Sequence, residues 1–240
     1  MVSSNRIRPP RMRRLLPVPL AIAALATMLV TAAPAAASGC PAGGEPPPPR
    51  ATQQQVDDLD GDGLPDALWI ANVREADGAT HRFVGVSTAS GAMSNVQIMT
   101  SSPIPLRALA IGAQNDSHHQ IIVSDGRGAY LYAFADCRIQ TIVDTHGAPF
   151  VFDMRNLRDN GTGVGCADLG DGPKLVALQA LLHNDQWTIR RTAIDLSGTV
   201  ASVGRSDTVT AGSAQDPAVT AAQTITCDGL SIDQDGVQER

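Results

Sequence analysis

Residues 56 to 70 read Val56-Asp57-Asp58-Leu59-Asp60-Gly61-Asp62-Gly63-Leu64-Pro65-Asp66-Ala67-Leu68-Trp69-Ile70. An acidic, glycine-bearing loop here runs directly into a short apolar segment. Carboxylate oxygens at alternate loop positions can converge on one hard cation, and glycines allow the chain to curl around it. A short apolar run after such a turn is typical of a buried strand. The stretch therefore predicts a β fold in which an acidic loop precedes a core strand.

The ligand set that this loop predicts consists of the side chains of Asp58, Asp60, Asp62 and Asp66, together with the Leu64 carbonyl. These residues fill loop positions one, three, five, nine and seven of a Ca²⁺ loop. Four carboxylates this close repel one another strongly without a cation, so we expect one structural Ca²⁺. The alternative is a solvated acidic turn. An EF-hand is rejected because its twelfth position, which needs a bidentate Glu, is Trp69.

Two further segments resemble this arrangement, at steps of about 55 residues, which is near the size of a propeller blade. Gly165–Gly172 precedes the apolar run Leu175–Leu178, and Ala110–Asp116 precedes Ile121–Val123. Chance similarity between Asp-Gly turns is the alternative explanation.

Short apolar runs separated by turn residues recur along the rest of the chain and predict about twelve strands. An all-β meander, sandwich or propeller follows from this spacing. The predicted strands are 67–73, 82–86, 96–100, 106–111, 120–123, 129–134, 138–143, 150–152, 174–182, 187–194, 199–203 and 224–227.

A D-x-D-x-D-G-x-x-D loop that leads into a buried strand resembles the FG-GAP/VCBS repeat, the blade unit of integrin-α-like β-propellers. In that family the loop binds calcium and stiffens the blade, while ligands are recognised elsewhere. The resemblance implies an all-β, propeller-like array of about three to four four-stranded blades, incomplete or open, or shared between subunits. The third copy has Asp168 and Asp171 but lacks the final acid and has Lys174 nearby. The middle copy offers only Asn115 and Asp116. The resemblance therefore implies the full ligand set only at the first loop.

The N-terminus has the order of a secretory signal peptide. Five arginines precede an apolar run from Val18 to about Ala33, and cleavage after Ala37 fits the small-residue pattern. A retained anchor is one alternative, and lipidation of Cys40 in a lipobox-like Ala37–Cys40 is another. We expect a signal peptide at 1–37, a Pro/Gly/Gln-rich spacer at 38–55 and the β domain at 56–240. The predicted location is secreted or in the cell envelope.

Disulfides are the expected state of cysteines outside the cytoplasm. The four cysteines contain no C-x-x-C pair, which argues against a zinc ribbon and against thioredoxin chemistry. Cys137 and Cys166 form the preferred pair, because both lie at the ends of neighbouring groups of strands. The other two cysteines are Cys40 and Cys227. If Cys40 carries a lipid, one of the remaining three cysteines has no partner for a disulfide.

Composition narrows the function. The net charge is −6, and without the five N-terminal arginines the remainder has 13 Lys+Arg against 24 Asp+Glu, a balance of −11. Such an acidic body argues against nucleic-acid binding, and membrane attachment is expected only through lipid on Cys40.

No G-x-S-x-G, phosphate loop or H-E-x-x-H is present. We predict a calcium-stabilised binding or scaffold protein without catalysis, with a protein or glycan ligand and an undetermined oligomeric state. The alternative is a secreted hydrolase or lyase that acts on a glycan or envelope polymer.

Overall fold

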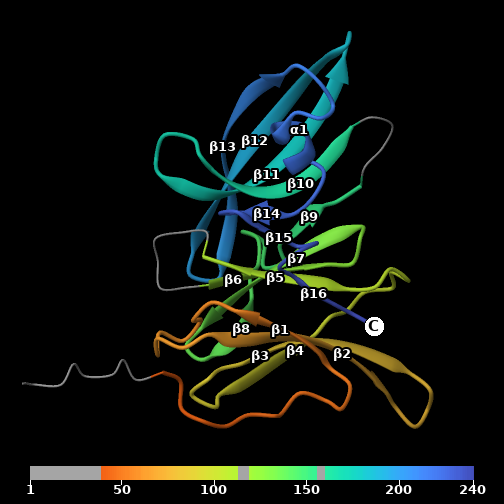
Figure 1. Ribbon diagram of the computed structural model, residues 1–240, viewed down its shortest axis with the longest axis vertical. Helices are drawn as coiled ribbons and strands as arrows, with labels where there is room; N and C mark the ends of the chain where they lie inside the picture. The colour runs from red at the N-terminus through yellow and green to blue at the C-terminus, as the bar shows by residue number, and fades with distance from the viewer. Residues whose placement is uncertain (1–38, 113–118, 156–159) are drawn as a thin grey trace, which may run out of the picture. The chain divides into compact units, whose positions relative to one another are not determined.

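A computed structural model describes residues 39–112, 119–155 and 160–240. The predicted signal peptide lies outside these residues. The described chain consists of antiparallel sheets with one short helix, so the all-β prediction is confirmed (Figure 1). No helix among the described residues is long and apolar enough to cross a membrane.

Sheet 1 is a four-stranded antiparallel meander in which each strand pairs with the next one along the chain. Its polar first strand lies at one edge of the sheet. Backbone hydrogen bonds to the neighbouring strand hold it there, and its glutamine side chains are exposed to solvent. Its strands are β1 (Thr52–Val56), β2 (Asp66–Arg74), β3 (Thr80–Ser87) and β4 (Met93–Gln97).

Sheet 2 repeats the four-stranded meander and adds two short strands. The C-terminal strand β16 pairs with β5 at one edge, while β9 pairs with β7. The strands are β5 (Arg107–Ile111), β6 (His119–Ser124), β7 (Gly128–Ala135), β8 (Arg138–Thr141), β9 (Val151–Asp153) and β16 (Val237–Gln238).

Sheet 3 is a third four-stranded meander with longer strands. Helix α1 (Pro217–Ala221) follows it and is capped by the Asp216 carboxylate, which accepts a hydrogen bond from the Ala218 N–H at 2.9 Å. The small hairpin β14 (Thr226–Cys227) and β15 (Leu230–Ser231) comes next. The sheet contains β10 (Gly161–Asp168), β11 (Pro173–His183), β12 (Gln186–Ser197) and β13 (Val200–Ala211).

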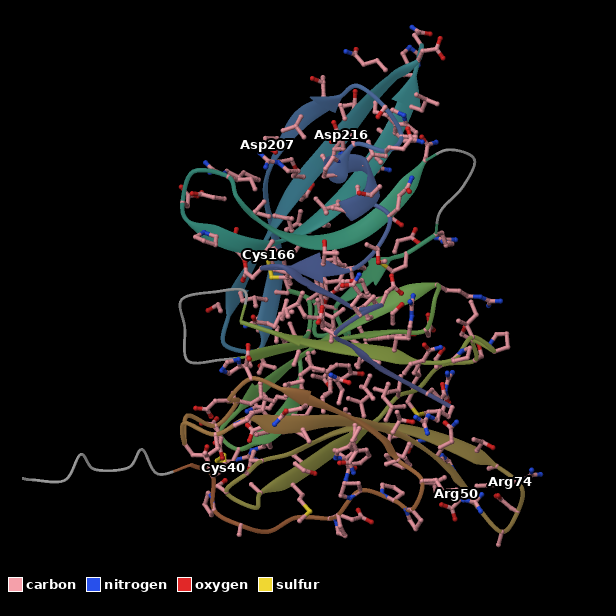
Figure 2. All side chains as sticks on the ribbon, in the orientation of Figure 1. Cys40, Arg50, Arg74, Cys166, Asp207 and Asp216 are labelled. Carbon is pink, nitrogen blue, oxygen red and sulfur yellow. A yellow bond between two sulfur atoms is a disulfide. The ribbon has the colours of Figure 1, made fainter. Side chains whose placement is uncertain are left out.

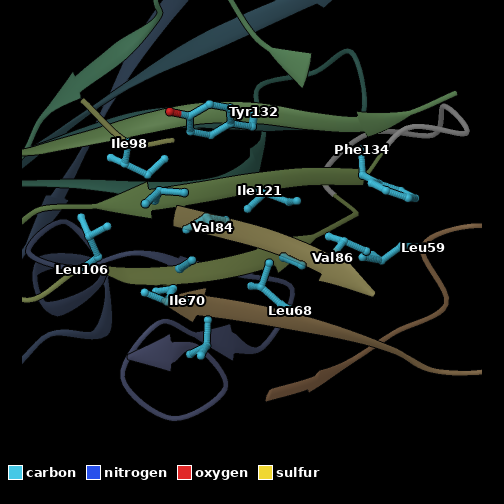
Figure 3. Close-up of a cluster of buried hydrophobic side chains, with 14 of the residues drawn as sticks. Leu59, Leu68, Ile70, Val84, Val86, Ile98, Leu106, Ile121, Tyr132 and Phe134 are labelled. Atoms are coloured by element: carbon cyan, nitrogen blue, oxygen red, sulfur yellow. The ribbon is translucent and has the colours of Figure 1, made fainter. Parts of the chain in front are cut away.

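The first core lies between sheets 1 and 2 (Figure 3). Alternate residues of β2 and β3 point into it, as the period of two in a strand requires. They meet inward residues of β6 and β7, and burial of this apolar surface is the main force that holds the two sheets together. The cluster includes Leu68, Ile70, Val84, Val86, Ile121, Val123, Tyr132 and Phe134.

The second core uses the opposite face of sheet 2. Leu109, Ile122 and Leu131 pack in one cluster with Leu175 and Ile194 of sheet 3. A third cluster lies between the outer face of sheet 3 and α1, where Val219 is fully buried. Sheet 2 therefore has a buried layer on each face, which explains the nearly continuous burial of β6.

The propeller prediction is supported only at its coarser level, that of four-stranded antiparallel sheets. The described residues form no closed propeller or barrel. The first and third acidic segments nevertheless lie at corresponding places, between the first and second strands of a meander: one between β1 and β2, the other between β10 and β11.

Parts of the segment predicted as a spacer, 38–55, take part in the fold. Gln53, Gln54 and Gln55 belong to β1 and pair with β2, and Cys40 is buried and disulfide-bonded. Gly43 also forms a bridge with Ala92. Composition misled the prediction because an edge strand can use polar side chains, since its stability comes from the backbone ladder.

The disulfides differ from the preferred Cys137–Cys166 pair. The bonds join Cys40 to Cys137 and Cys166 to Cys227 (Figure 2). Cys137 lies in the turn between β7 and β8, on the side of sheet 2 that faces sheet 1, whereas Cys166 packs with the second core. Sheet 2 therefore separates the surroundings of the two cysteines, and each bonds within its own core. The Cys40 sulfur is thereby committed to a protein bond, which argues against lipidation.

Gly85 of β3 leaves room for the fully buried Trp69 ring. A Cβ at Gly85 would come within 2.1 Å of Trp69 Cζ2 and 2.2 Å of Cε2. We expect Gly85→Ala to destabilise the protein by about 1–3 kcal/mol through overpacking, measured by urea denaturation. Gly212→Ala is the matched control, because its Cβ would meet no atom within 4 Å. Equal losses in the two variants would contradict this explanation.

Candidate metal centre

The acidic loop lies between β1 and β2, and Asp66 is the first residue of β2. The Asp66 side chain is buried at 2% exposure. Its Oδ2 accepts the Leu59 N–H at 2.7 Å, and its Oδ1 accepts the Ala89 N–H at 2.8 Å. One carboxylate thus joins the acidic loop to the turn between β3 and β4.

Asp60 links the same loop to two other segments. Its Oδ2 accepts the Cys40 N–H at 2.8 Å and the Ser90 hydroxyl at 2.5 Å. Because Cys40 is bonded to Cys137, the acidic loop, the β3–β4 turn and the β7–β8 turn are tied together at one end of sheet 1.

Asp58 organises the loop itself. Its Oδ1 accepts the Gly61 N–H at 2.7 Å, and its Oδ2 accepts the Gly63 N–H at 2.7 Å. Gly61 and Gly63 have φ of 77° and 85°, a left-handed conformation that glycine adopts without strain. The glycines that the sequence singled out are therefore required by the curl of the loop.

Three of the predicted ligands come together. One carboxylate oxygen from each of Asp58, Asp60 and Asp66 lies within 4.8 Å of the other two. Asp62 is not part of this group, since its Oδ1 accepts the Leu64 N–H at 2.7 Å within the loop. Leu64 exposes 55% of its surface. The structure thus gathers the first, third and ninth loop positions.

Electrostatics distinguish the clustered carboxylates from one another. Burial, followed by repulsion from Asp60 and Asp58, raises the pKa of Asp66, although its two backbone hydrogen bonds oppose that shift. Burial also acts to raise the pKa of Asp60, but the hydrogen bonds from Ser90 and from the Cys40 and Asp62 backbone outweigh it and leave the pKa lowered. A positive ion beside the three groups would relieve the repulsion at Asp66.

A cavity of about 350 Å³ lies beside the loop. Asp60, Leu59, His119 and the Cys40–Cys137 disulfide line it. His119 is the first residue of β6. It comes from sheet 2, so no local pattern in the sequence could have placed it beside Asp60.

The third copy of the loop has a different charge arrangement. Asp168 Oδ1 accepts the Gly170 and Gly172 N–H groups at 2.6 and 3.0 Å, which repeats the turn made by Asp58. Asp171, however, lies 3.9 Å from Lys174 Nζ and 3.7 Å from Arg205 Nε. Protein cations therefore balance the acid here. In the second copy, Asn115 and Asp116 lie outside the described residues.

The described residues contain a second cluster of possible metal ligands, but it does not provide a metal site. Cys166, Cys227 and Asp228 lie close together, but the two sulfurs are bonded to each other and have no thiolate to offer. The acidic loop before β2 remains the best candidate.

Comparison of the chain with protein-family models, with curated proteins and with solved structures finds no match. Function must therefore be inferred from the geometry of this chain.

Proposed function

We propose that this protein is an exported, calcium-stabilised β-sheet protein that acts in binding or as a scaffold, and that its repeats are of the FG-GAP/VCBS kind. The observation that carries the proposal is the convergence of Asp58, Asp60 and Asp66 in a loop that also joins three separate segments. The corresponding positions of the first and third acidic segments in their meanders support the repeat assignment.

The donor set fits calcium. Carboxylate oxygens are hard ligands of the kind that Ca²⁺ selects, and calcium sites accept flexible loop geometry. Asp58, Asp60 and Asp66 would hold the ion, with Asp62 and the Leu64 carbonyl as the further ligands predicted from the sequence. Bound calcium would supply positive charge and fix the loop, with no part in any reaction.

Export is supported by the two disulfides, which are typical of oxidising compartments, and by the signal-like N-terminal sequence. A calcium clamp suits such a location, because extracellular calcium modules often bind with Kd near 10⁻⁴ to 10⁻³ M. The Cys40–Cys137 disulfide and the metal would then stabilise the same end of sheet 1.

Calcium should raise the melting temperature of the full mature chain by a few degrees relative to chelator. At a free concentration about ten times Kd, binding adds about 1.4 kcal/mol to stability. Asp58→Asn should abolish this calcium-dependent shift, because it removes one charge from the convergent group. The measurement is a thermal melt in Ca²⁺ and in EDTA.

Asp168→Asn is the matched control, because Asp168 makes the same turn but its neighbour Asp171 is balanced by Lys174 and Arg205. It should keep the full calcium shift. Identical melting temperatures of the unmodified protein in Ca²⁺ and in EDTA would defeat the calcium proposal.

The alternative of a hydrolase or lyase gains no specific support. A cavity of about 510 Å³ contains Asp125, which is buried at 4% exposure. Burial acts to raise its pKa, but hydrogen bonds from Thr100, from the backbone of Gly128 and Arg127, and from Tyr130 outweigh this and lower it. Asp153, in the same cavity, is paired with Arg155. Both carboxylates therefore have partners within the fold.

A further inference from the structure

A cleft of about 340 Å³ lies where β9 of sheet 2 meets the face of sheet 3 that carries Ala177, Gln179 and Arg190. Figure 1 shows β9 beside β10 at this junction. This size is within the range of small-molecule sites, which are mainly apolar and contain a few polar groups that orient the ligand.

The wall of the cleft is largely apolar. Phe150 and Val151 come from the β9 side, while Ile194 and Val203 come from sheet 3. Val203 is 71% exposed and Val151 is 44% exposed, which is unusual for aliphatic residues on facing elements. The Phe150 ring stands edge-on to Phe152, with centroids 5.1 Å apart, and this contact fixes the β9 side.

Arg190 contributes an uncompensated positive charge to this apolar cleft. It lies in β12, opposite Gln179 of β11 and Thr208 of β13, and its side chain is exposed. Among the described residues it has no carboxylate partner. Its neighbour Arg191 points to the other face of the sheet and is paired with Asp207.

Asp153, the one acid among the described residues that line the cleft, does not balance Arg190. Both oxygens of Asp153 accept hydrogen bonds from the Arg155 guanidinium, each at 2.9 Å. Gln179 and Thr192, which also line the cleft, are neutral and offer hydrogen bonds beside Arg190. The cleft thus combines one free guanidinium with an apolar wall.

We propose that this cleft binds a monomeric anionic amphiphile, with its carboxylate on Arg190 and its apolar body against Val151, Ile194 and Val203. A guanidinium matches a carboxylate through two parallel hydrogen bonds, and Val151 and Val203 would lose their exposure to water. This inference rests on the binding role proposed above but is independent of calcium.

The test uses decanoate below its micelle-forming concentration and isothermal titration of the full mature chain. We expect saturable binding at one site, and binding at least about tenfold weaker in Arg190→Gln, because a charge-assisted hydrogen bond is lost. Val203→Ser should weaken binding by several-fold. Decyltrimethylammonium, with the same chain and the opposite charge, should not bind at this site.

Arg138→Gln is the matched control, since Arg138 is exposed on β8 and does not line the cleft. It should bind decanoate as the unmodified protein does. Equal affinity in Arg190→Gln and in the unmodified protein would overturn the proposal, as would equal binding of decyltrimethylammonium. Arg190-dependent binding to phosphatidylglycerol vesicles without binding of decanoate would also overturn it, in favour of a membrane-docking face.

The titrations are performed in both Ca²⁺ and EDTA. Decanoate binding that persists without a calcium-dependent melting shift would refute the calcium proposal alone. A calcium shift without decanoate binding would refute the cleft alone.

Discussion

Replacing Cys40 and Cys137 together by serine should lower the free energy of unfolding by about 4–5 kcal/mol. The two residues are 97 positions apart in the sequence, so their bond removes a large loop-closure entropy from the unfolded chain. The chain-entropy relation gives about 4.7 kcal/mol for a loop of this length. In a domain of this size such a loss corresponds to roughly 10–20 °C in melting temperature.

The effect of removing the second disulfide can be compared with that of removing the first. Cys166 and Cys227 are 61 positions apart, for which the same relation gives about 4.3 kcal/mol. The Cys166→Ser/Cys227→Ser variant should therefore melt close to the first variant. Non-reducing peptide mapping checks the pairing directly. A peptide that links Cys137 to Cys166, or a lipid on Cys40, would contradict the assignment.

The disulfide pairing shows what local sequence could not supply. Cys137 and Cys166 are near in sequence, but the turn after β7 and strand β10 contribute to different cores. Which face of a sheet a residue reaches depends on tertiary packing, and four cysteines allow three pairings. That the cysteines form disulfides could be predicted from the sequence, whereas their pairing could not.

Strand prediction succeeded where apolar residues marked the core and failed where small or polar residues formed the strand. β10 was missed because its inner positions are Gly161, Gly163 and Gly165. A Cβ at Gly163 would come within 2.6 Å of the Thr224 carbonyl oxygen, so close backbone packing takes the place of side-chain burial. The edge strand β1 was missed because glutamines carry no hydrophobic pattern.

Two other elements differ from the prediction, although the local sequence contains residues that indicate them. β13 continues to Ala211, beyond the predicted end at Val203, and its register shifts opposite Thr192 and Ile194 at a bulge that includes Gly204. A bulge and charged residues such as Arg205 protect an edge strand from further pairing. The short helix α1 is preceded by Asp216 and begins with Pro217, a combination typical of a helix N-terminus.

The acidic loop was predictable because its chemistry is local. Asp58, Asp60 and Asp66 converge through turns that its own glycines permit. The groups that hold the loop from outside, the Cys40 and Ala89 N–H groups and the Ser90 hydroxyl, belong to distant segments. The sequence therefore predicted the centre of this site and missed its supports.

Glu239→Ala should cost about 3 kcal/mol of stability, the low end for a buried pair, because it leaves the part-buried Arg82 guanidinium without its carboxylate. The Ser102 and Ile104 carbonyl oxygens still accept hydrogen bonds from this guanidinium. The side chains of Arg82 and Glu239 are 13% and 8% exposed and form an ion pair. Arg82 Nε donates to both Glu239 oxygens at 3.0 and 3.1 Å, and the Leu106 N–H donates to Oε2. The pair joins the C-terminal residues beyond β16 to β3, and thus sheet 2 to sheet 1.

The same contact predicts a dependence on pH. Burial acts to raise the pKa of Glu239, but hydrogen bonds from Arg82, the Leu106 N–H and Asn72, with the Arg82 charge, outweigh burial and lower it. Because the folded pKa is lowered, this stabilisation is fully present above the ordinary Glu pKa of 4.5 and is lost as pH falls through the folded value.

Urea denaturation between pH 7 and pH 3 tests both statements. The difference in unfolding free energy between the unmodified protein and Glu239→Ala should be largest at pH 7 and should shrink below about pH 4. Glu75→Ala is the matched control, because Glu75 is exposed in the β2–β3 turn and should change stability by less than about 0.5 kcal/mol. The Arg82→Met/Glu239→Leu double variant should recover part of the loss, since an apolar pair leaves no buried charge behind. A Glu239→Ala loss that is small, or that stays constant with pH, would show that the ion pair does not hold the two sheets together.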